Sequence, residues 1–549
     1  MHRSHRSHRS HRSRRSQRSR ARAALAAWAL FLASLVAAPA SPAVPAAAPT
    51  PPPTPIPTPV PTPTGDDPLA RFHAQRVQWK DCPDRPVPAE MQCATVDVPR
   101  DYAAPGKGTV KVALARIPAT DRKNRIGSLL LNFGGPGAPG TASLADSAKF
   151  FADLGERYDL IGFDPRGVGH SEPVSCGGPQ HADEEAIPDA AALLAALRSL
   201  ARRCELASGP VLPYIGTVNV SRDMDVIRRV LGDEKLNYLG FSYGARLGAV
   251  YAAQFPGSTG RMVLDGVDTL TAPLAERALV STRAQQRALD NFLSWCAHQQ
   301  DCVYGTNTRT AKEKVAALVT RLDEEPLVGE DGTYLTGQVA AVAMGNALYS
   351  QQTWPALAEA LASAERDRDP AGLLQLSGPL IPPPDDEDDD EDQDAGPGTV
   401  PADNALAALA AVNCADDPDR SRDKADPAVV EQELLDLEGE FLKASEIFGP
   451  RQLMTVLACY GRPAGTDFIR RINHPGAPRM LLIGTRGDPA TPYEWTEETA
   501  ERLGSAVIVD HKGEGHTAYA ASSCVKEYVD HFLLDGRLPS GTRSCPAGE

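Results

Sequence analysis

The sequence lacks several features that would each indicate a different class of protein. Its apolar run over residues 23–38 has 16 residues, fewer than the roughly 20 that a membrane-spanning helix needs. No cysteine precedes Cys82, so the region after this run offers no thiol for a lipid anchor. No Cys-x-x-Cys pair occurs, and no other Cys/His spacing indicates a metal site. We therefore expect no metal and no organic cofactor.

Negative charge exceeds positive charge outside the N-terminus. The 549 residues have a net charge of −15, and the first 22 contain nine Arg and no Asp or Glu, so the remainder carries about −24. Nucleic-acid binding requires a basic face toward phosphates, and this balance argues against it. With 42% hydrophobic and 23% charged residues, the composition is that of a globular protein, not of a collagen-like, coiled-coil or wholly disordered chain.

The N-terminal region predicts export. Residues 1–40 combine an Arg-rich start, the short apolar run and an A-x-A-like cleavage site at Ala38-Pro39-Ala40, as in a secretory signal peptide. An uncleaved anchor is the alternative, and Arg14-Arg15 leaves twin-arginine export open. All ten cysteines lie between Cys82 and Cys545, and this even number favours disulfides and an extracellular location. We expect no membrane span after signal cleavage.

A proline-rich linker precedes the folded part. Residues 41–65 are mainly Pro, Ala and Thr, a composition typical of an extended polyproline II spacer, with a ligand for a proline-binding domain as the alternative. Residues 385–394 contain nine carboxylates in ten positions and predict a solvated, disordered loop. Calcium binding or a basic partner is the alternative for this acidic tract.

The folded part predicts a mostly parallel, doubly wound α/β sheet. Apolar runs without alternation are typical of parallel strands that are covered on both faces. The predicted strands are Val110–Ile117, Ser128–Phe133, Asp159–Phe163, Leu236–Leu239, Met262–Leu264, Met480–Ile483 and Ala506–Val509. Helical stretches separate most of them.

A long helical insertion interrupts the predicted sheet. No strand is predicted between residues 267 and 475, where helices are expected at Glu276–His298, Thr310–Leu322, Gln338–Leu348 and Val429–Ser445. Residues 66–266 and 476–549 then form the two parts of the sheet domain, and residues 267–475, here called the cap, form a lid over it.

Ser242 is the predicted nucleophile. It lies in Gly240-Phe241-Ser242-Tyr243-Gly244, which follows the strand Leu236–Leu239 and precedes a helical run over residues 245–254. The G-x-S-x-G pattern in this strand–turn–helix context indicates a nucleophile on a tight turn, where larger residues than glycine would collide with neighbouring backbone.

A serine nucleophile needs a base and an orienting carboxylate. Asp488 follows the strand Met480–Ile483 and His516 follows the strand Ala506–Val509, so both are expected in loops at strand C-termini. Asp265, at the end of the strand before the cap, is the alternative acid. The other histidines considered are His511, which ends the last strand and is more easily structural, and His170 and His474, which lie in the wrong segments.

The oxyanion formed during acylation needs two backbone N–H donors. We expect Tyr243, which follows the nucleophile, to supply one. The segment Asn132-Phe133-Gly134-Gly135-Pro136-Gly137 should supply the other, with Gly135 favoured and Gly134 as the alternative. This glycine-rich segment has neither the spacing of a dinucleotide-binding motif nor a P-loop lysine.

These motifs in combination resemble secreted tripeptidyl aminopeptidases of the prolyl-aminopeptidase-like family of serine peptidases, which have the α/β-hydrolase fold. The resemblance spans residues 81–546 and rests on GGPG, FDPRGVGHS (163–171), GFSYGARLGAVYAAQFP (240–256), DPATP (488–492) and GEGH. The segment from Ser523-Cys524 to Cys545 looks like the C-terminal segment of the tripeptidyl branch. Asn132-Phe133 departs from the His that commonly precedes the glycine pair in prolyl aminopeptidases, which fits the tripeptidyl branch better than strict proline specificity.

The resemblance implies hydrolysis of peptides near a free N-terminus, with release of tripeptides and with acidic groups of the cap binding the substrate ammonium. Local spacing and the family pattern also suggest five disulfides, namely Cys82–Cys93, Cys176–Cys204, Cys296–Cys302, Cys414–Cys459 and Cys524–Cys545. A carboxylic ester hydrolase or lipase with the same triad is the first alternative. A non-catalytic surface binding protein is the second.

Overall fold

The computed structural model describes residues 67–82, 87–178, 190–270, 272–378, 399–418, 427–463, 465–467, 472–473 and 476–548. The predicted signal peptide, the linker, the acidic tract and His474 lie outside the described residues.

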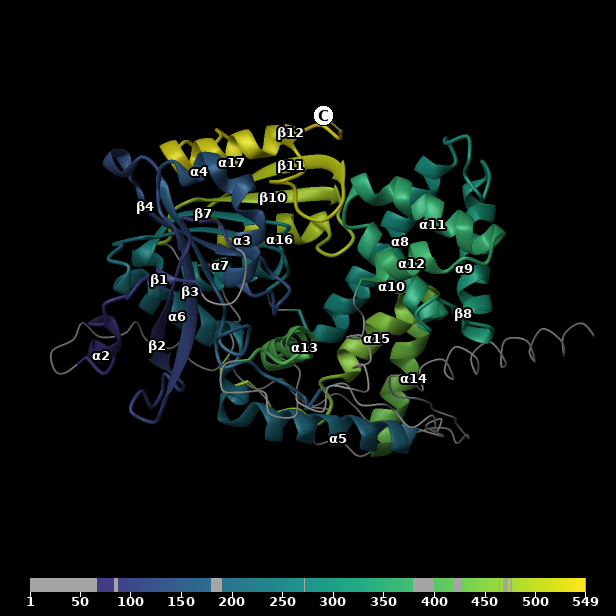
Figure 1. Cartoon of the computed structure of the whole chain (residues 1–549), viewed down its shortest axis with the longest axis horizontal. Helices are drawn as coiled ribbons and strands as arrows, with labels where there is room; N and C mark the ends of the chain where they lie inside the picture. Colours follow the sequence, from purple (N-terminus) through teal and green to yellow (C-terminus); the bar gives the residue numbers. More distant parts are fainter. Residues whose placement is uncertain are drawn as a thin grey trace, which may run out of the picture.

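The centre of the molecule is a ten-stranded sheet (Figure 1) with the order β1-β2-β3-β5-β4-β6-β7-β10-β11-β12. Strands β1, β2, β3 and β5 pair antiparallel, and the neighbours from β5 to β12 pair parallel. The strands are β1 (Lys80–Asp81), β2 (Gln92–Pro99), β3 (Thr109–Ile117), β4 (Gly127–Asn132), β5 (Tyr158–Phe163), β6 (Leu236–Phe241), β7 (Thr259–Asp265), β10 (Met480–Gly487), β11 (Ala506–Glu514) and β12 (Arg543–Cys545). The predicted, mostly parallel α/β sheet is confirmed, and β1, β2 and β12 are strands that the sequence did not reveal.

Apolar side chains leave the central strands on both faces. In β4, Leu130 belongs to the hydrophobic cluster on one face of the sheet, whereas Leu129 and Leu131 belong to the cluster on the other face. In β10 the same division separates Leu482 from Leu481 and Ile483. Successive side chains of a strand point to opposite faces, so covering both faces requires the continuous apolar runs seen in the sequence.

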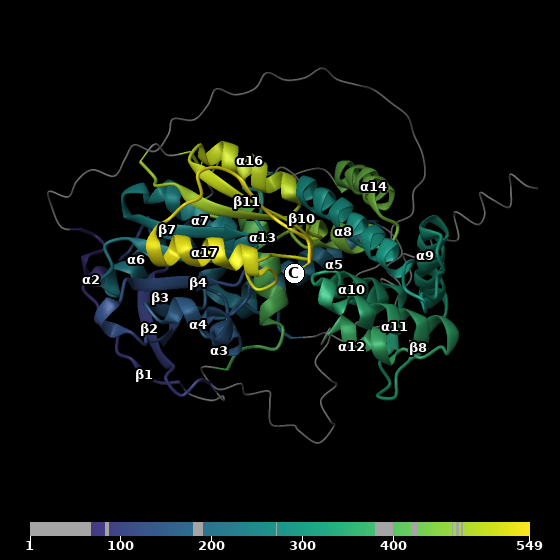
Figure 2. The ribbon, with the colours of Figure 1, turned by 90° about the horizontal axis from the view of Figure 1, so that it is seen from above.

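Helices cover both faces of the sheet (Figures 1 and 2). Residues of α6 and α7 contribute to the core on one face, and residues of α3, α4 and α17 contribute to the core on the other. The helices of this part are α2 (Ala70–His73), α3 (Gly140–Ser147), α4 (Ala152–Gly155), α5 (Ala190–Ser208), α6 (Thr217–Val230), α7 (Tyr243–Gln254), α16 (Tyr493–Leu503) and α17 (Ser523–Asp535).

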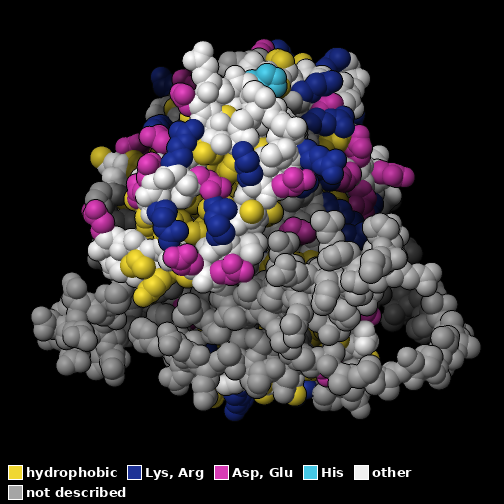
Figure 3. All heavy atoms as spheres, turned by 90° about the vertical axis from the view of Figure 1, so that its right-hand side faces the viewer, with side chains coloured by type: hydrophobic (Ala, Val, Ile, Leu, Met, Phe, Trp, Pro, Cys, Tyr) yellow, Lys and Arg dark blue, Asp and Glu magenta, His cyan; other side chains and the backbone are white. Residues whose placement is uncertain are grey.

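The cap connects β7 to β10 and is mainly helical. Its helices are α8 (Leu274–Cys296), α9 (Thr308–Glu324), α10 (Gly337–Ala347), α11 (Trp354–Arg366), α12 (Ala371–Ser377), α13 (Asn404–Asp416), α14 (Pro427–Ala444) and α15 (Gly449–Leu457). The four helices expected from periodicity match α8, α9, α10 and α14 to within two residues at each end. The expectation that no strand occurs in the cap is wrong, because β8 (Leu327–Val328) and β9 (Tyr334–Leu335) form a short hairpin. The face formed by the cap mixes basic and acidic side chains (Figure 3).

Two helices pack across the boundary between the cap and the sheet domain that was expected from the sequence. Ala407, Ala408 and Ala411 of α13, within the cap segment, belong to the main core of the sheet domain. Conversely, α5 precedes the cap in sequence, yet its leucines pack against Val430 and Leu434 of α14. The cap and the sheet domain therefore share hydrophobic contacts along α5 and α13.

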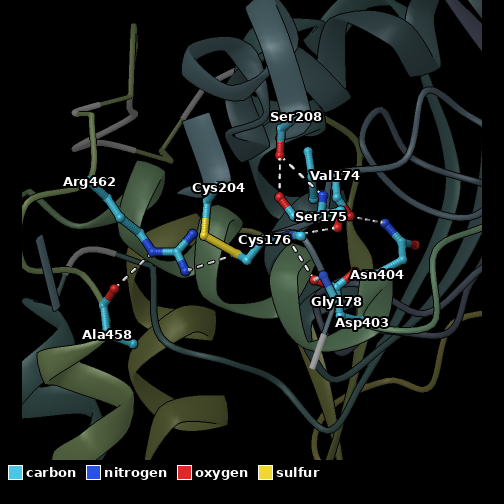
Figure 4. Close-up of a disulfide and its surroundings, with 11 residues drawn as sticks. Val174, Ser175, Cys176, Gly178, Cys204, Ser208, Asp403, Asn404, Ala458 and Arg462 are labelled. Carbon is cyan, nitrogen blue, oxygen red and sulfur yellow. Dashed lines mark hydrogen bonds between the residues drawn. A yellow bond between two sulfur atoms is a disulfide. The ribbon is translucent and has the colours of Figure 1, made fainter. Parts of the chain in front are cut away.

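Five disulfides are present, with the pairs that the resemblance implied: Cys82–Cys93, Cys176–Cys204, Cys296–Cys302, Cys414–Cys459 and Cys524–Cys545. The second joins the loop after β5 to α5 (Figure 4). The Cys176 N–H donates to Asp403 at 2.7 Å, and Arg462 donates to the Cys176 sulfur at 3.7 Å. This disulfide thus lies where the sheet domain meets two segments of the cap. Within the described residues, no helix has the length and apolar character to cross a membrane.

Candidate active site

Ser242 occupies the single position between β6 and α7. Its φ of 58° and ψ of −122° place a non-glycine residue in the strained positive-φ region, as in a tight strand-to-helix turn. The Ser242 N–H donates to the carbonyl oxygen of Asp265 at 2.8 Å, which fixes the turn against the end of β7.

The glycines that flank Ser242 are required by close contacts with neighbouring atoms. A Cβ on Gly240 would lie 2.4 Å from the carbonyl oxygen of Gly244, and a Cβ on Gly244 would lie 2.7 Å from Oδ1 of Asn132. Neither position accommodates a side chain. The two glycines therefore allow β6, the turn and the first residues of α7 to pack against the end of β4.

Asp488 and His516 lie next to each other after two adjacent parallel strands. Asp488 directly follows β10, and His516 is the second residue after β11. Nδ1 of His516 is 2.9 Å from each carboxylate oxygen of Asp488. Asp488 also accepts the N–H groups of Ala490 and Thr491 at 2.8 Å each and the Thr491 hydroxyl at 2.9 Å. These bonds hold a fully buried carboxylate in place.

The environment of His516 makes it a stronger base. Burial of the ring lowers the pKa of His516, but the charge and hydrogen bond of Asp488 outweigh that effect, so the pKa is raised above its ordinary value. Because Nδ1 faces Asp488, Nε2 is the nitrogen left to exchange a proton with a nucleophile. The arrangement is that of a general base with its orienting acid.

Asp265 has a different function from that of the acid paired with His516. Its carboxylate accepts the N–H of Ala518, 3.1 and 3.0 Å from its two oxygens, and the N–H of Tyr519 at 2.8 Å. Burial raises the pKa of Asp265 to about 6, although these N–H groups oppose the shift. Asp265 thus holds the Ser242 turn through its carbonyl and the loop after His516 through its carboxylate.

The close approach of His516 to Gly266 places the His516 ring near the Ser242 turn. A Cβ on Gly266 would lie 3.3 Å from Cε1 of His516, and Gly266 has a φ of 66°. Because the Ser242 N–H is hydrogen-bonded to Asp265, the imidazole lies against Gly266, the residue next to the one that holds the Ser242 turn. The structure therefore gathers Ser242, Asp488 and His516 at the C-terminal edge of the sheet.

The other histidines considered in the sequence are placed elsewhere or are not described. His511 is buried within β11, where its Nδ1 lies 3.2 Å from the Thr485 hydroxyl. His170 is exposed in the loop after β5, and its backbone N–H donates to Asp164 at 2.9 Å.

The glycine-rich segment after β4 lies against the Ser242 turn. A Cβ on Gly134 would lie 2.5 Å from the Phe241 carbonyl oxygen and 2.9 Å from Cβ of Ser242. The Gly134 N–H donates to the Asn132 side chain at 3.1 Å, so this donor already has an acceptor. Tyr243 begins α7, and its hydroxyl lies 2.6 Å from the Thr217 hydroxyl. Asn132 and Thr491 are site residues whose contacts the sequence did not predict.

The cap contacts the loops of both Asp488 and His516. The His516 N–H donates to the Tyr349 carbonyl oxygen at 2.8 Å, and Ser350 forms an antiparallel bridge with Gly515. On the other side, the Ser281 hydroxyl of α8 donates to the Ala490 carbonyl at 3.2 Å. The part of the chain that the structure describes holds no cluster of three or more His, Cys, Asp or Glu side chains suited to a metal ion.

The chain is similar to known hydrolases both in its family models and in its overall sequence. Residues 127–379 match the model of the alpha/beta hydrolase fold, and residues 445–545 match that of the TAP-like proteins. Serine protease Hip1 of Mycobacterium tuberculosis is 32% identical over 86% of this chain and 91% of its own length. Tripeptidyl aminopeptidase of Streptomyces lividans is 30% identical over 87% and 88%, and Carboxylesterase B of Mycobacterium tuberculosis is 34% identical over 88% and 92%.

These relatives align over most of their lengths, and the chain has the sheet and the helical insertion described above. The expected fold and enzyme class are both confirmed. The chain is a serine hydrolase, and it belongs to the α/β-hydrolase-fold family of serine peptidases that includes the tripeptidyl aminopeptidases.

Proposed function

We propose that the protein is a secreted serine exopeptidase that cleaves peptides near a free N-terminus and releases tripeptides, with Ser242, His516 and Asp488 as its catalytic triad. The observation that carries the proposal is the Asp488–His516 pair at 2.9 Å beside a strained Ser242 turn. The relatives named tripeptidyl aminopeptidase and serine protease support peptides as the substrate class.

In the first step, Nε2 of His516 takes the hydroxyl proton while Oγ of Ser242 attacks the carbonyl carbon of the scissile bond. The tetrahedral intermediate then collapses, the C–N bond breaks, and His516 gives its proton to the leaving amine. Water, deprotonated by His516, hydrolyses the acyl-enzyme and frees the tripeptide. Asp488 keeps Nδ1 protonated and stabilises the imidazolium in both halves of the reaction.

The N–H groups of Tyr243 and Gly135 are the proposed oxyanion donors. Tyr243 is the first residue of α7, where backbone N–H groups lack helical acceptors and the helix dipole favours negative charge. Gly135 is favoured over Gly134 because the Gly134 N–H is bonded to the Asn132 side chain. The Asn132 side chain thus occupies one of the two candidate N–H donors of this segment.

Serine dependence is tested with Ser242→Ala and, as a matched control, Ser294→Ala, an exposed serine on α8. We expect Ser242→Ala to lose turnover of a tripeptide p-nitroanilide and labelling by a fluorophosphonate, with an unchanged circular dichroism spectrum. Ser294→Ala should keep both activities. Retained turnover in Ser242→Ala would place the nucleophile elsewhere.

A free substrate N-terminus is the second test. A tripeptide p-nitroanilide should be hydrolysed much faster than its N-acetylated counterpart, because an exopeptidase binds the ammonium group in its cleft. Two tripeptides should also be released in sequence from a longer peptide, as seen by mass spectrometry. Equal rates on free and acetylated substrates would contradict the exopeptidase assignment.

Carboxylic ester hydrolysis is a second candidate function, favoured by the relative named Carboxylesterase B at 34% identity. The triad geometry serves esters and amides alike. If this candidate is correct, kcat/KM for p-nitrophenyl acyl esters will exceed that for tripeptide anilides, and acetylation will have no effect.

Export is proposed from the signal peptide over residues 1–40 and is supported by the five disulfides, which persist in oxidising compartments. N-terminal sequencing of protein from the culture medium should begin at Ser41. Protein that stays in the cell with residues 1–40 attached would contradict export.

A further inference from the structure

A corner of the cap holds the main chain beside the catalytic histidine. The corner consists of Tyr349 and Ser350, which follow α10. It accepts the His516 N–H at 2.8 Å and pairs with Gly515 as an isolated antiparallel bridge. Gly515 has a φ of 99°, and a Cβ there would lie 2.7 Å from the Tyr349 carbonyl oxygen. The glycine directly before His516 is therefore required by the approach of the cap.

The Tyr349 side chain continues this contact to the imidazole. Its ring centroid lies 5.0 Å from that of His516, and the two ring planes are nearly perpendicular at 76°. Perpendicular rings at this separation attract each other through their quadrupoles. Tyr349 keeps 43% of its surface exposed, so one part of the ring contacts His516 while another faces solvent.

The direction of proton transfer indicates which part of the substrate the exposed part of the Tyr349 ring contacts. His516 must give its proton to the leaving nitrogen, so an open surface beside the imidazole adjoins the leaving half of the substrate. We propose that Tyr349 is a positioning residue for His516 and that its ring forms the subsite for the first residue of the leaving peptide. This inference rests on the proposed peptidase function.

The chemistry of the subsite predicts its preference. An aromatic ring favours apolar or aromatic side chains, and it would also attract a cation. Asp488 and Arg451 of α15 both lie within electrostatic range of the Tyr349 hydroxyl, so charges of both signs adjoin the ring. The ring itself therefore sets the preference, and the favoured leaving residue is apolar or aromatic, such as Leu or Phe.

Acyl transfer measures this subsite directly. A tripeptide ester with a free N-terminus forms the acyl-enzyme, and added amino-acid amides compete with water for it. We expect the wild-type protein to form product with Leu-amide and Phe-amide about 3- to 10-fold more efficiently than with Gly-amide. Tyr349→Ala should reduce this ratio to below 2, and Tyr349→Phe should retain it. Tyr334→Ala, an exposed cap tyrosine on β9, is the matched control.

Comparing substrates with two different leaving groups distinguishes an effect on the position of His516 from a general loss of structure. His516 acts as a base toward both substrates, but only the peptide bond also needs it to donate a proton, because p-nitrophenolate leaves without one. Tyr349→Ala should therefore lower kcat/KM for tripeptide amides by about 3-fold or more beyond its effect on kcat/KM for the p-nitrophenyl ester of the same tripeptide. Tyr349→Leu, which keeps an apolar side chain of similar length, provides a second variant should the alanine variant fold poorly.

Each outcome has a defined meaning. Equal losses on amide and ester in folded Tyr349→Ala or Tyr349→Leu, or an unchanged ratio of Leu-amide to Gly-amide product in folded Tyr349→Ala, would overturn the inference while Ser242→Ala stays inactive. An active Ser242→Ala variant would instead overturn the proposed function. Fluorophosphonate labelling that goes to completion shows that the variants keep a competent nucleophile.

Discussion

Two buried carboxylates lie near His516, and replacing each by its amide distinguishes their functions. Both oxygens of Asp488 are 2.9 Å from Nδ1 of the ring, whereas Asp265 binds the N–H groups of Ala518 and Tyr519. Asp488→Asn leaves an amide opposite Nδ1 and favours the tautomer with its proton on Nε2. Asp265→Asn keeps one acceptor oxygen and turns an NH2 group toward backbone N–H groups.

The expected losses differ by about two to three orders of magnitude. Replacing the acid of a Ser-His-Asp triad by Asn lowers kcat on the order of 10⁴-fold, because the wrong tautomer cannot accept the serine proton. Asp265→Asn loses one charge-assisted hydrogen bond to the backbone, worth about 1.5–3 kcal/mol. If all of that free energy is lost in the transition state, kcat/KM falls by about 10- to 100-fold.

The assay is kcat/KM for a tripeptide p-nitroanilide, with the melting temperature of each variant measured in parallel. The melting temperatures separate a loss of structure from a loss of chemistry, because each carboxylate accepts two backbone N–H groups that its amide would oppose. A larger loss of activity in Asp265→Asn than in Asp488→Asn would refute this assignment and make Asp265 the triad acid.

Three further changes follow from the same geometry. Thr491→Val removes the hydroxyl that donates to Asp488 at 2.9 Å, and kcat should fall about 10-fold with little change in KM; an unchanged kcat would show that the backbone N–H groups suffice to orient the acid. The raised pKa of His516 places the acidic limb of the kcat/KM profile above pH 6.5, because the protonated ring cannot act as the base, and a limb well below this value would contradict the pairing with Asp488. Gly515→Ala, whose Cβ would lie 2.7 Å from the Tyr349 carbonyl, should lower both kcat and the melting temperature, whereas Gly257→Ala, with no atom near its Cβ, should change neither.

The central sheet could be predicted because most of its strands are continuous apolar runs in the sequence. Runs such as Ser128–Leu131 lack the alternation of apolar and polar residues that an amphipathic element would show. Strands β1 and β12 were missed because each has only two or three residues, and exposed side chains predominate in both. Their strand state comes from tertiary pairing at the sheet edges. Disulfides also hold them there, since Cys82 directly after β1 is bonded to Cys93 of β2, and Cys545 of β12 is bonded to Cys524.

Candidate site residues could be named from the sequence only where a residue carries a local motif. Ser242, Asp488 and His516 follow strand ends in recognisable loops, and the structure pairs Asp488 with His516 at the edge of the sheet where Ser242 also lies. Whether Asp265 or Asp488 meets the imidazole could not be decided from spacing, since both residues follow parallel strands at the same edge. That choice depends on loop direction, which Asp265 itself sets by binding the N–H groups after His516.

No sequence motif marks Tyr349, because its contacts depend on where the cap returns to the sheet domain. The cap leaves the sheet after β7 and re-enters at β10, two strands that are neighbours in the sheet. It therefore begins at the C-terminal edge where the nucleophile turn lies, and ends at the start of the strand that leads to Asp488. The corner at Tyr349 pairs with the loop after β11, so His516 is held by Asp265 from the sheet side and by Tyr349 from the cap side. A cap that only covered the cleft would need no such main-chain contact. The paired contacts link the orientation of the His516 ring to the position of the cap. With the proposed subsite at Tyr349, substrate selection and proton transfer would share one structural element.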